Sequence, residues 1–386
     1  MTRFLFLTWD GGGNEPPAIG LAQELQKRGH HVTFAGYASQ QGRFTQRGFP
    51  FVLLQESQSA LEAGSSEDGL GRFVEGILVC APQLTEVPEV FTREHAEVLV
   101  VDCMLFAAVT AAQRAHLPTA VLVHSPPGAL LHPDRILGQA ALQPLNAMRA
   151  DAGLVTIDRL WEMWRGMVAV CTSIPQLDPL RDEIPPECVY VGPIVERVSP
   201  SGWRGPWARG DERSLILVSF STGEGFPQRS RIERTIAGLA TMPYRVLVTT
   251  SRADVRGITV PENAVLIESV PHLEILPEVA VTVTHAGHGT ILSSLTHGVP
   301  LVCLPNPLIA DQIPLAVQVE RLGAGRVLDG EAALPADIAS VVDEVATAPA
   351  YRAAAHELAR IIAAMPGAAA AVHQLERATE GPRPRI

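Results

Sequence analysis

The sequence predicts an α/β protein built from two domains, each organised around a parallel β-sheet. Short apolar runs rich in Val, Ile and Leu alternate with helical stretches in both halves of the chain, which is typical of buried parallel strands joined by helices. The segment 199–211, SPSGWRGPWARGD, is rich in Gly, Pro and Ser and interrupts this pattern near the middle of the chain. The length of 386 residues suits two domains of ordinary size.

The first half opens with a βαβ unit. We expect a buried strand at residues 3–9, a helix from Pro17 to about Arg28, and a second strand at 31–36. Pro at the start of this helix and Gly29 at its end are typical of helix termini. The later strands predicted in this half lie at 48–54, 98–101, 119–123, 168–172 and 189–191.

Residues 129–170 are loosely helical and carry Trp161 and Trp164, three residues apart. We interpret this pair as a packing face, and a platform for a ligand is the alternative. The second half restarts with a strand at 214–220, and a loop is expected at 270–276. The later strands predicted in this half lie at 245–249, 264–267, 281–284 and 301–304.

These elements predict the domain boundaries. A first domain covers 1–198, a linker 199–212, a second domain 213–365, and a C-terminal segment 366–386. Helical sequence at 351–376 is interrupted at Pro366-Gly367, where that last segment begins.

Composition excludes several functions. A net charge of −11 argues against nucleic acid and anionic membrane surfaces as partners. The five cysteines lack CxxC spacing and are expected to be reduced residues of the core. The chain enters a strand without a signal-peptide n-region, and no apolar run approaches the roughly 18–20 residues of a membrane helix. We therefore expect a cytoplasmic protein.

The segment 280–312 carries the most specific pattern. A β-branched run ends at His285, and Gly287, Gly289 and Thr290 follow where a helix begins. The two glycines let the backbone approach a ligand closely, and the helix N-terminus suits a phosphate. The imidazole of His285 can add a hydrogen bond, and the Thr290 hydroxyl can cap the helix or contact a phosphate oxygen.

After the next strand, Asp311 and Gln312 offer an acceptor and a donor pair for sugar hydroxyls. Together with the preceding glycine-rich turn, they predict a site for a sugar diphosphate.

This segment resembles the donor-binding signature of family-1 glycosyltransferases, which have the GT-B fold. The matching positions are His285, Gly287, Gly289, Thr290, Gly298-Val299-Pro300, Asp311-Gln312 and, upstream, Val270-Pro271-His272. The resemblance implies two Rossmann-like domains whose parallel sheets face a central cleft, with the C-terminal helix and tail crossing back to the first domain. It also implies a nucleotide diphosphate sugar as co-substrate without a further cofactor, a small-molecule acceptor, and a homodimer as one candidate assembly.

The resemblance assigns further donor contacts and shows one departure. Thr222, in the loop after the first strand of the second half, would lie near the diphosphate, Val270 near the base, and His288 beside the glycine turn. Many members carry a Glu that grips the ribose where this chain has Ser294. Its absence leaves both dTDP and UDP sugars as candidate donors.

A second departure concerns the general base that an inverting transfer requires. Members of the family usually place a His or Asp three residues before the proline of the first loop, and this position is Gly13. Gly12, Gly13 and Asn14 form the loop on the acceptor side, and Asp102 matches the residue that usually orients the base.

Three residues can replace the missing base: Asp10, His124 and Asp102. Each has a structural alternative, namely a turn-forming Asp, a structural His at a strand end, and a cap of the next helix. No Asp-x-Asp pair is placed to bind a divalent ion, so we expect no metal site and a metal-independent reaction.

The sequence therefore predicts an inverting glycosyltransferase that moves a (deoxy)sugar from dTDP or UDP to a small lipophilic natural product. Because Gly13 stands at the usual base position, a catalytically silent nucleotide-sugar-binding accessory protein is one alternative. A nucleotide-sugar epimerase of the same fold is the other.

Overall fold

The computed structural model describes residues 1–64, 66, 68–198, 201–208, 210–220, 228–251, 253–307 and 311–378. The chain divides into two compact units. Unit 1 comprises Met1–Pro175, Leu180–Arg197 and Pro366–Ile386, and unit 2 comprises Gln176–Pro179 and Val198–Met365. The sequence placed its own boundaries at 198 and 365.

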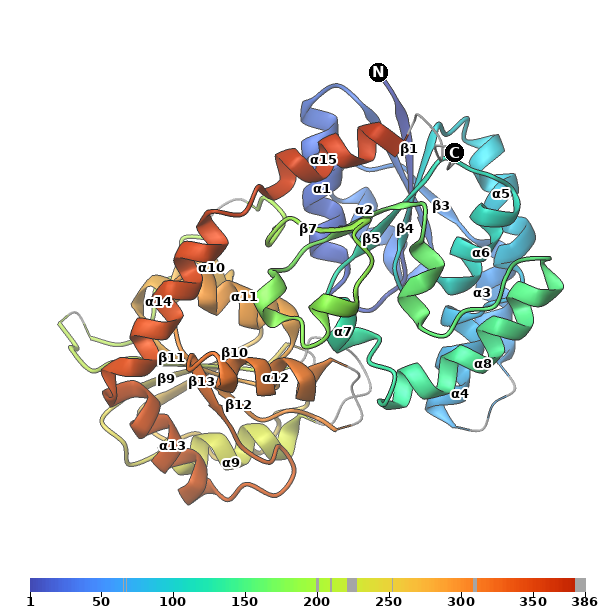
Figure 1. Ribbon diagram of the computed structural model, residues 1–386. Coiled ribbons are helices and arrows are strands. Elements are labelled where there is room, and N and C mark those ends of the chain that lie inside the picture. Colours follow the sequence, from blue (N-terminus) through green and yellow to red (C-terminus); the bar gives the residue numbers. More distant parts are fainter. Residues whose placement is uncertain are drawn as a thin grey trace. The chain divides into compact units, whose positions relative to one another are not determined.

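Unit 1 contains a seven-stranded parallel sheet with the order β3-β2-β1-β4-β5-β6-β7 (Figure 1). Its strands are β1 Arg3–Leu7, β2 His31–Gly36, β3 Phe51–Leu53, β4 Val98–Asp102, β5 Thr119–Val123, β6 Val168–Cys171 and β7 Cys188–Tyr190. Every residue of β4 and β5 is buried, because helices cover both faces of the sheet. This explains why these strands are continuous apolar runs in the sequence.

The α-helices of unit 1 are α1 Glu15–Lys27, α2 Gln41–Thr45, α3 Gln55–Ala63, α4 Gly69–Phe73, α5 Gln83–Arg93, α6 Phe106–Arg114, α7 Pro127–Leu130, α8 Ile136–Asp151 and α15 Gly367–Arg377. The last of these, α15, packs against α1, although the two are far apart in the sequence (Figure 1). Its residues Ala371, Val372 and Leu375 join the core that contains Phe4 and Phe6 of β1. The C-terminal helix thus belongs to the core of the N-terminal sheet.

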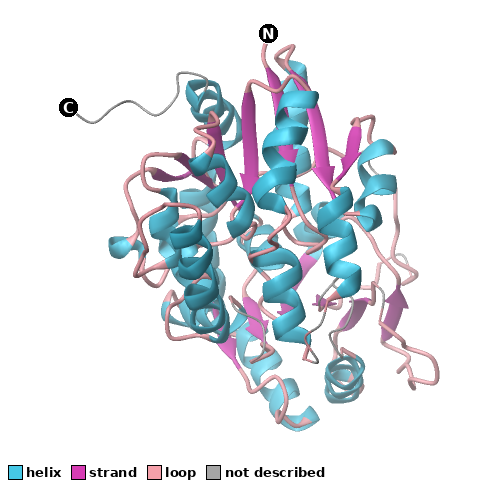
Figure 2. Ribbon diagram, turned by 90° about the vertical axis from the view of Figure 1, so that its right-hand side faces the viewer, coloured by secondary structure: helices cyan, strands magenta, loops and turns pink. Residues whose placement is uncertain are grey.

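Unit 2 contains a six-stranded parallel sheet with the order β10-β9-β8-β11-β12-β13. Its strands are β8 Leu215–Ser219, β9 Arg245–Thr249, β10 Ala264–Ile267, β11 Val279–Thr284, β12 Leu301–Cys303 and β13 Gly325–Val327. Its α-helices are α9 Arg229–Leu239, α10 His272–Ile275, α11 His288–Thr296, α12 Gln312–Arg321, α13 Pro335–Thr347 and α14 Pro349–Ala363. Helices flank the strands in both units (Figure 2).

The structure confirms the α/β class with two parallel sheets and corrects several elements. The expected loop at 270–276 contains the short helix α10, the strand at 48–54 shrinks to β3, and the short edge strand β13 was not predicted. Trp161 and Trp164 are each 1% exposed, which confirms their interpretation as a packing face. All five cysteines are buried and free.

Among the described helices, none is by itself both long and apolar enough to cross a membrane. Only the bent pair Pro349–Ala363 and Gly367–Arg377 reaches those limits, when its two members are counted together.

Each sheet has one point at which the strand order reverses. In unit 1 it lies between β1 and β4, and in unit 2 between β8 and β11. Open α/β sheets bind ligands at the carboxyl ends of the strands beside such a point. Two clusters of polar residues follow these strands, one in each unit, and each cluster is a candidate site on its own unit.

Candidate active site

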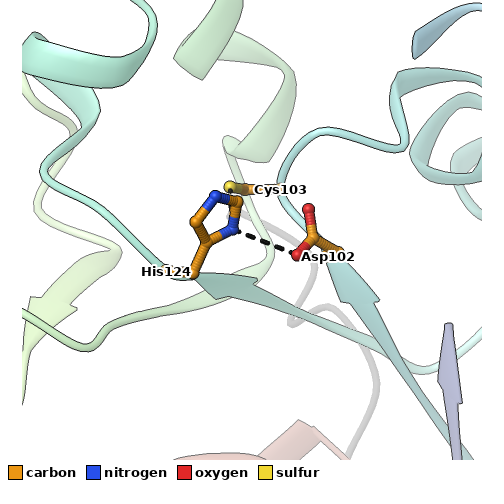
Figure 3. Close-up of side chains that lie close together, drawn as sticks. All are labelled: Asp102, Cys103 and His124. Carbon is orange, nitrogen blue, oxygen red and sulfur yellow. Dashed lines mark hydrogen bonds and ion pairs between the residues drawn. The ribbon is translucent and has the colours of Figure 1, made fainter. Parts of the chain in front are cut away.

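An aspartate and a histidine meet at the carboxyl edge of the sheet in unit 1. Asp102 is the last residue of β4, and His124 directly follows the neighbouring strand β5, so the parallel register brings the two side chains together. His124 Nδ1 lies 3.1 Å from Asp102 Oδ2 (Figure 3). The Asp102 side chain is 2% exposed and that of His124 is 12% exposed.

Three further N–H groups hold the Asp102 carboxylate. The indole Nε1 of Trp9 donates to Oδ1 at 3.1 Å, and the backbone N–H of Met104 donates to the same oxygen at 2.9 Å. The Asn14 Nδ2 donates to Oδ2 at 3.0 Å. Since both oxygens are engaged, the carboxylate has a fixed orientation toward His124.

Asp102 and His124 shift each other's pKa in opposite directions. Burial acts to raise the pKa of Asp102, but the charge of His124 and the hydrogen bonds from His124, Met104 and Asn14 outweigh it and lower this pKa. Burial acts to lower the pKa of His124, but Asp102 and Cys103 outweigh it and hold this pKa well above its ordinary value. The carboxylate is thus anionic and stabilises a proton on the imidazole.

Cys103 completes this cluster, with Sγ 3.5 Å from His124 Nδ1. In the described part of the chain, Asp102, Cys103 and His124 are the group of possible metal ligands found close together, with ligand atoms within 4.8 Å of one another. The carboxylate already accepts three N–H groups and contacts the imidazole, and burial raises the pKa of the Cys103 thiol. Hydrogen bonding therefore accounts for the arrangement of the three side chains.

The loop after β1 has a different role from the one expected of a base-carrying loop. Gly13 is exposed, and a Cβ built there meets no described atom within 4 Å. Position 12 requires glycine because its φ is +72°, a backbone conformation that other residues rarely adopt. Asn14 is the N-cap residue of α1, but its side chain makes no capping hydrogen bond and donates to Asp102 instead. The loop thus supplies hydrogen-bond donors to Asp102.

The other candidate base on this loop, Asp10, makes a different contact. Arg43 Nη1 lies 3.3 Å from Asp10 Oδ1 and also pairs with the buried carboxylate of Glu15. Its described partner is therefore a cation on α2. The structure thus brings together two of the three candidates, Asp102 and His124.

In unit 2, His285 follows β11 and packs over the glycine turn. A Cβ at Gly287 would lie 2.4 Å from His285 Nε2, so glycine is required there for the imidazole to take this position. Burial lowers the pKa of His285 to about 4, against a hydrogen bond to the Ser219 backbone that raises it. The ring is therefore neutral at ordinary pH, and it can offer a hydrogen bond to a ligand but no positive charge.

The helix that follows, α11, has an open N-terminus. Gly287 is its N-cap residue and carries no side chain that could cap the first turn. Gly289 is exposed, and a Cβ built there meets no described atom within 4 Å. His288 and Thr290 flank it in the first turn and are half-buried. The first turn can therefore receive an anion at close range.

The remaining donor-side residues lie in varied settings. Asp311 and Gln312 stand at the start of α12, where the buried Gln312 accepts the Asn306 backbone N–H at 2.8 Å. Val270 is 8% exposed and belongs to a core cluster. Thr222 lies outside the described residues.

Ser294 stands where the resemblance would place a Glu. Its side chain is fully buried and donates a hydrogen bond to Thr282 Oγ1 at 2.9 Å. It therefore faces the sheet.

Sequence reasoning missed three residues of these clusters. Trp9 and Cys103 were read only as parts of a strand and of the core, because their contacts with Asp102 and His124 come from neighbouring strands. The third is Arg231 in the first turn of α9, which is buried and pairs with Glu331 at 2.9 Å. Its charge also acts on His285. An arginine just after a glycine-rich loop was the available signal.

The fold is that of solved glycosyltransferases. The glycotransferase of kitacinnamycin superposes with a TM-score of 0.78 at 22% identity, over 98% of this chain and 98% of that one. This likeness establishes the GT-B architecture for the chain.

Sequence comparison finds relatives among the glycosyltransferases. Residues 233–378 match the C-terminal domain of the erythromycin biosynthesis protein CIII-like family. The 4'-demethylrebeccamycin synthase of Lentzea aerocolonigenes is 26% identical over 421 residues, covering 97% of this chain and 99% of that protein. The uncharacterized UDP-glucosyltransferase YojK of Bacillus subtilis (strain 168) is 23% identical over 406 residues, covering 98% of each. Over nearly its whole length the chain is thus similar to glycosyltransferases, and residues 233–378 resemble a domain of a protein family of antibiotic biosynthesis.

Proposed function

We propose that the protein is an inverting, metal-independent glycosyltransferase that moves a (deoxy)sugar from a dTDP or UDP donor to a small lipophilic acceptor. The observation that carries this proposal is that each of the two sheets has a polar cluster at its own switch point. One is a carboxylate–imidazole pair, and the other is a glycine-lined helix N-terminus beside a histidine.

The donor half of the proposal rests on unit 2. The first turn of α11 offers backbone N–H groups to the β-phosphate, and Gly289 lets the phosphate approach without meeting a Cβ. His285 adds a neutral hydrogen-bonding ring, and Asp311 and Gln312 are proposed to contact the sugar hydroxyls. Negative charge that develops on the leaving diphosphate is then stabilised by these fixed dipoles.

The catalytic half rests on unit 1. His124 accepts the proton of the acceptor hydroxyl on Nε2 while the acceptor oxygen forms its bond to the anomeric carbon. The bond from that carbon to the diphosphate oxygen breaks, and the nucleoside diphosphate leaves with the electron pair. Asp102 holds Nδ1–H and stabilises the imidazolium that results.

A lipophilic acceptor is supported by a cavity of about 510 Å³ in unit 1. Leu131, Leu142 and Leu160 contribute to its lining, together with polar residues such as Asn146 and Asp158. The lining begins seven residues after His124 in the sequence. The lining combines these leucines with six polar or charged residues, so it suits a small organic molecule that has both apolar and polar parts.

The test is turnover with purified protein. A panel of dTDP and UDP sugars is incubated with lipophilic phenols, alcohols and amines. Free nucleoside diphosphate and glycosylated product are measured by mass spectrometry, and the anomeric configuration of the product is determined by NMR. We expect transfer with inverted anomeric configuration that EDTA does not abolish. Tight nucleotide binding without transfer or donor hydrolysis would instead identify a silent binder, and conversion of the sugar on its nucleotide would identify an epimerase.

A further inference from the structure

We infer that Trp9 is a positioning residue for His124: its indole N–H holds the Asp102 carboxylate in the orientation that engages the imidazole Nδ1. The inference rests on the proposed role of His124 as the base. It assigns to the first loop the function of orienting Asp102, in place of carrying the base itself.

Trp9 is held in place through its backbone carbonyl and through its ring. The Trp9 carbonyl accepts the Gly11 backbone N–H at 2.9 Å and the Asn14 Nδ2 at 3.0 Å. Its ring packs 5.1 Å from the Phe73 ring, measured between centroids. A Cβ at Gly11 would lie 2.6 Å from the indole Cη2, so glycine leaves the space that the ring occupies. The N–H is therefore held on Oδ1 by packing on several sides.

Trp9 and His124 act on opposite oxygens of one carboxylate. The indole donates to Oδ1 at 3.1 Å and the imidazole contacts Oδ2 at 3.1 Å. Rotation of the carboxylate would break both contacts together, so the indole resists such rotation. Asn14 bonds both the Trp9 carbonyl and Oδ2, which links the loop to the same group.

The indole also sets how strongly Asp102 attracts a proton on His124. An N–H directed at a carboxylate stabilises its charge, and removing that N–H makes the carboxylate more basic. The other titratable group that acts on His124 is Cys103, 3.5 Å from Nδ1. Without the Trp9 N–H, the imidazolium is held more tightly and deprotonates at higher pH.

The first test is the pH profile of Trp9→Phe, which keeps an aromatic ring but removes the donor. We expect the acid limb of kcat/KM to move to higher pH, so that activity falls by roughly threefold more on this limb than at the alkaline plateau. The KM for the donor should stay unchanged, since unit 2 is untouched. The matched control is Trp203→Phe, the same substitution at a tryptophan that packs against a core cluster of unit 2, and its limb should match that of the native protein.

The second test needs neither substrate nor a stable variant. In ¹⁵N-labelled native protein, the indole N–H signal of Trp9, one of five tryptophans, should titrate with the same midpoint as the ring signals of His124. The inference would be overturned by a Trp9 signal that does not shift as His124 titrates. It would also be overturned if well-folded Trp9→Phe kept the acid limb of kcat/KM at the native pH. Because this titration is read without turnover, absence of transfer would count against the proposed function and leave the inference intact.

Discussion

At the scale of single residues, the feature to test is the proton acceptor that we propose. His124 contacts Asp102 from the adjacent strand, whereas Gly13 on the first loop has no side chain that could accept a proton. Parallel strands end at the same edge, so a side chain after β5 can take the role of one on the loop after β1. The proposed role of His124 as the base leads to two predictions.

Removing the imidazole should stop catalysis and spare binding. We expect His124→Gln to lower kcat by roughly 10²–10⁴-fold, as is typical for loss of a general base. The affinity for nucleoside diphosphate, measured by calorimetry, should remain within about twofold, because the donor residues lie in unit 2. The control is His373→Gln, whose side chain is 68% exposed on α15 and should keep full activity. A fully active His124→Gln would show that another group takes the proton.

The pH dependence should follow the charge of the pair. A base works in its deprotonated form, and the pKa of His124 is raised well above 6.5, after burial is outweighed by Asp102 and Cys103. We therefore expect kcat/KM to rise with pH through a midpoint above 6.5. In Asp102→Asn the carboxylate that opposes burial is gone, so the midpoint should move to lower pH while the plateau rate falls. Profiles of the two proteins with the same midpoint would contradict this account.

At the scale of elements, the donor site depends on one helix start. α11 begins directly after β11, and its first turn carries glycines at 287 and 289 for different reasons. Gly287 makes room for the protein's own His285 ring, whereas the space above Gly289 contains no described atom. A substitution at Gly289 can therefore test ligand binding, whereas one at Gly287 would first disturb the protein's own His285 ring.

Gly289→Ala provides the corresponding test. Alanine fits the protein and favours a helix by about 1 kcal/mol over glycine, so the melting temperature should hold or rise. Its methyl group should obstruct a phosphate and weaken binding of nucleoside diphosphate by roughly tenfold, which corresponds to about 1.4 kcal/mol. The matched control is Gly42→Ala on α2, where a Cβ also meets no described atom within 4 Å. If both variants bind nucleoside diphosphate with equal affinity, the phosphate does not bind at the start of this helix.

At the scale of the whole molecule, the chain's last helix stabilises its first sheet. Leu375 on α15 is fully buried in the core that contains β1, β2 and α1. The helix before it, α14, belongs to unit 2 and contacts α11. Two consecutive helices thus serve the cores of different units.

We expect Leu375→Ala to destabilise unit 1 by about 2–4 kcal/mol, through lost burial and the cavity left behind. Hydrogen exchange followed by mass spectrometry should show faster exchange in peptides of β1, β2 and α1, and unchanged exchange in β8 and β11. The matching control is Leu358→Ala on α14. Leu358 is 3% exposed, so its truncation should speed exchange in unit 2 instead. Uniform acceleration in both units would mean that they unfold as one body.

The sequence by itself determined the elements and the donor motif. Strands such as β2, β5, β9 and β10 were predicted at their observed ends, because buried parallel strands must be continuous apolar runs bounded by turn residues. The turn at 285–290 was recognisable for a similar reason, since glycines and a helix start are local features of the chain. Short edge elements such as β13 and α10 escaped notice, because so few residues leave little periodicity to detect.

Only the tertiary structure decided how the polar residues combine. The sequence left Asp10, His124 and Asp102 as three candidates for the base. The strand order β1-β4-β5 brings His124 and Asp102 together, whereas Asp10 pairs with Arg43. The same holds for Trp9, which reaches Asp102 from the neighbouring strand, and for Ser294, whose side chain the helix directs toward the sheet. Strand order and helix rotation are set by packing between distant segments, so the pattern of neighbouring residues could not reveal them.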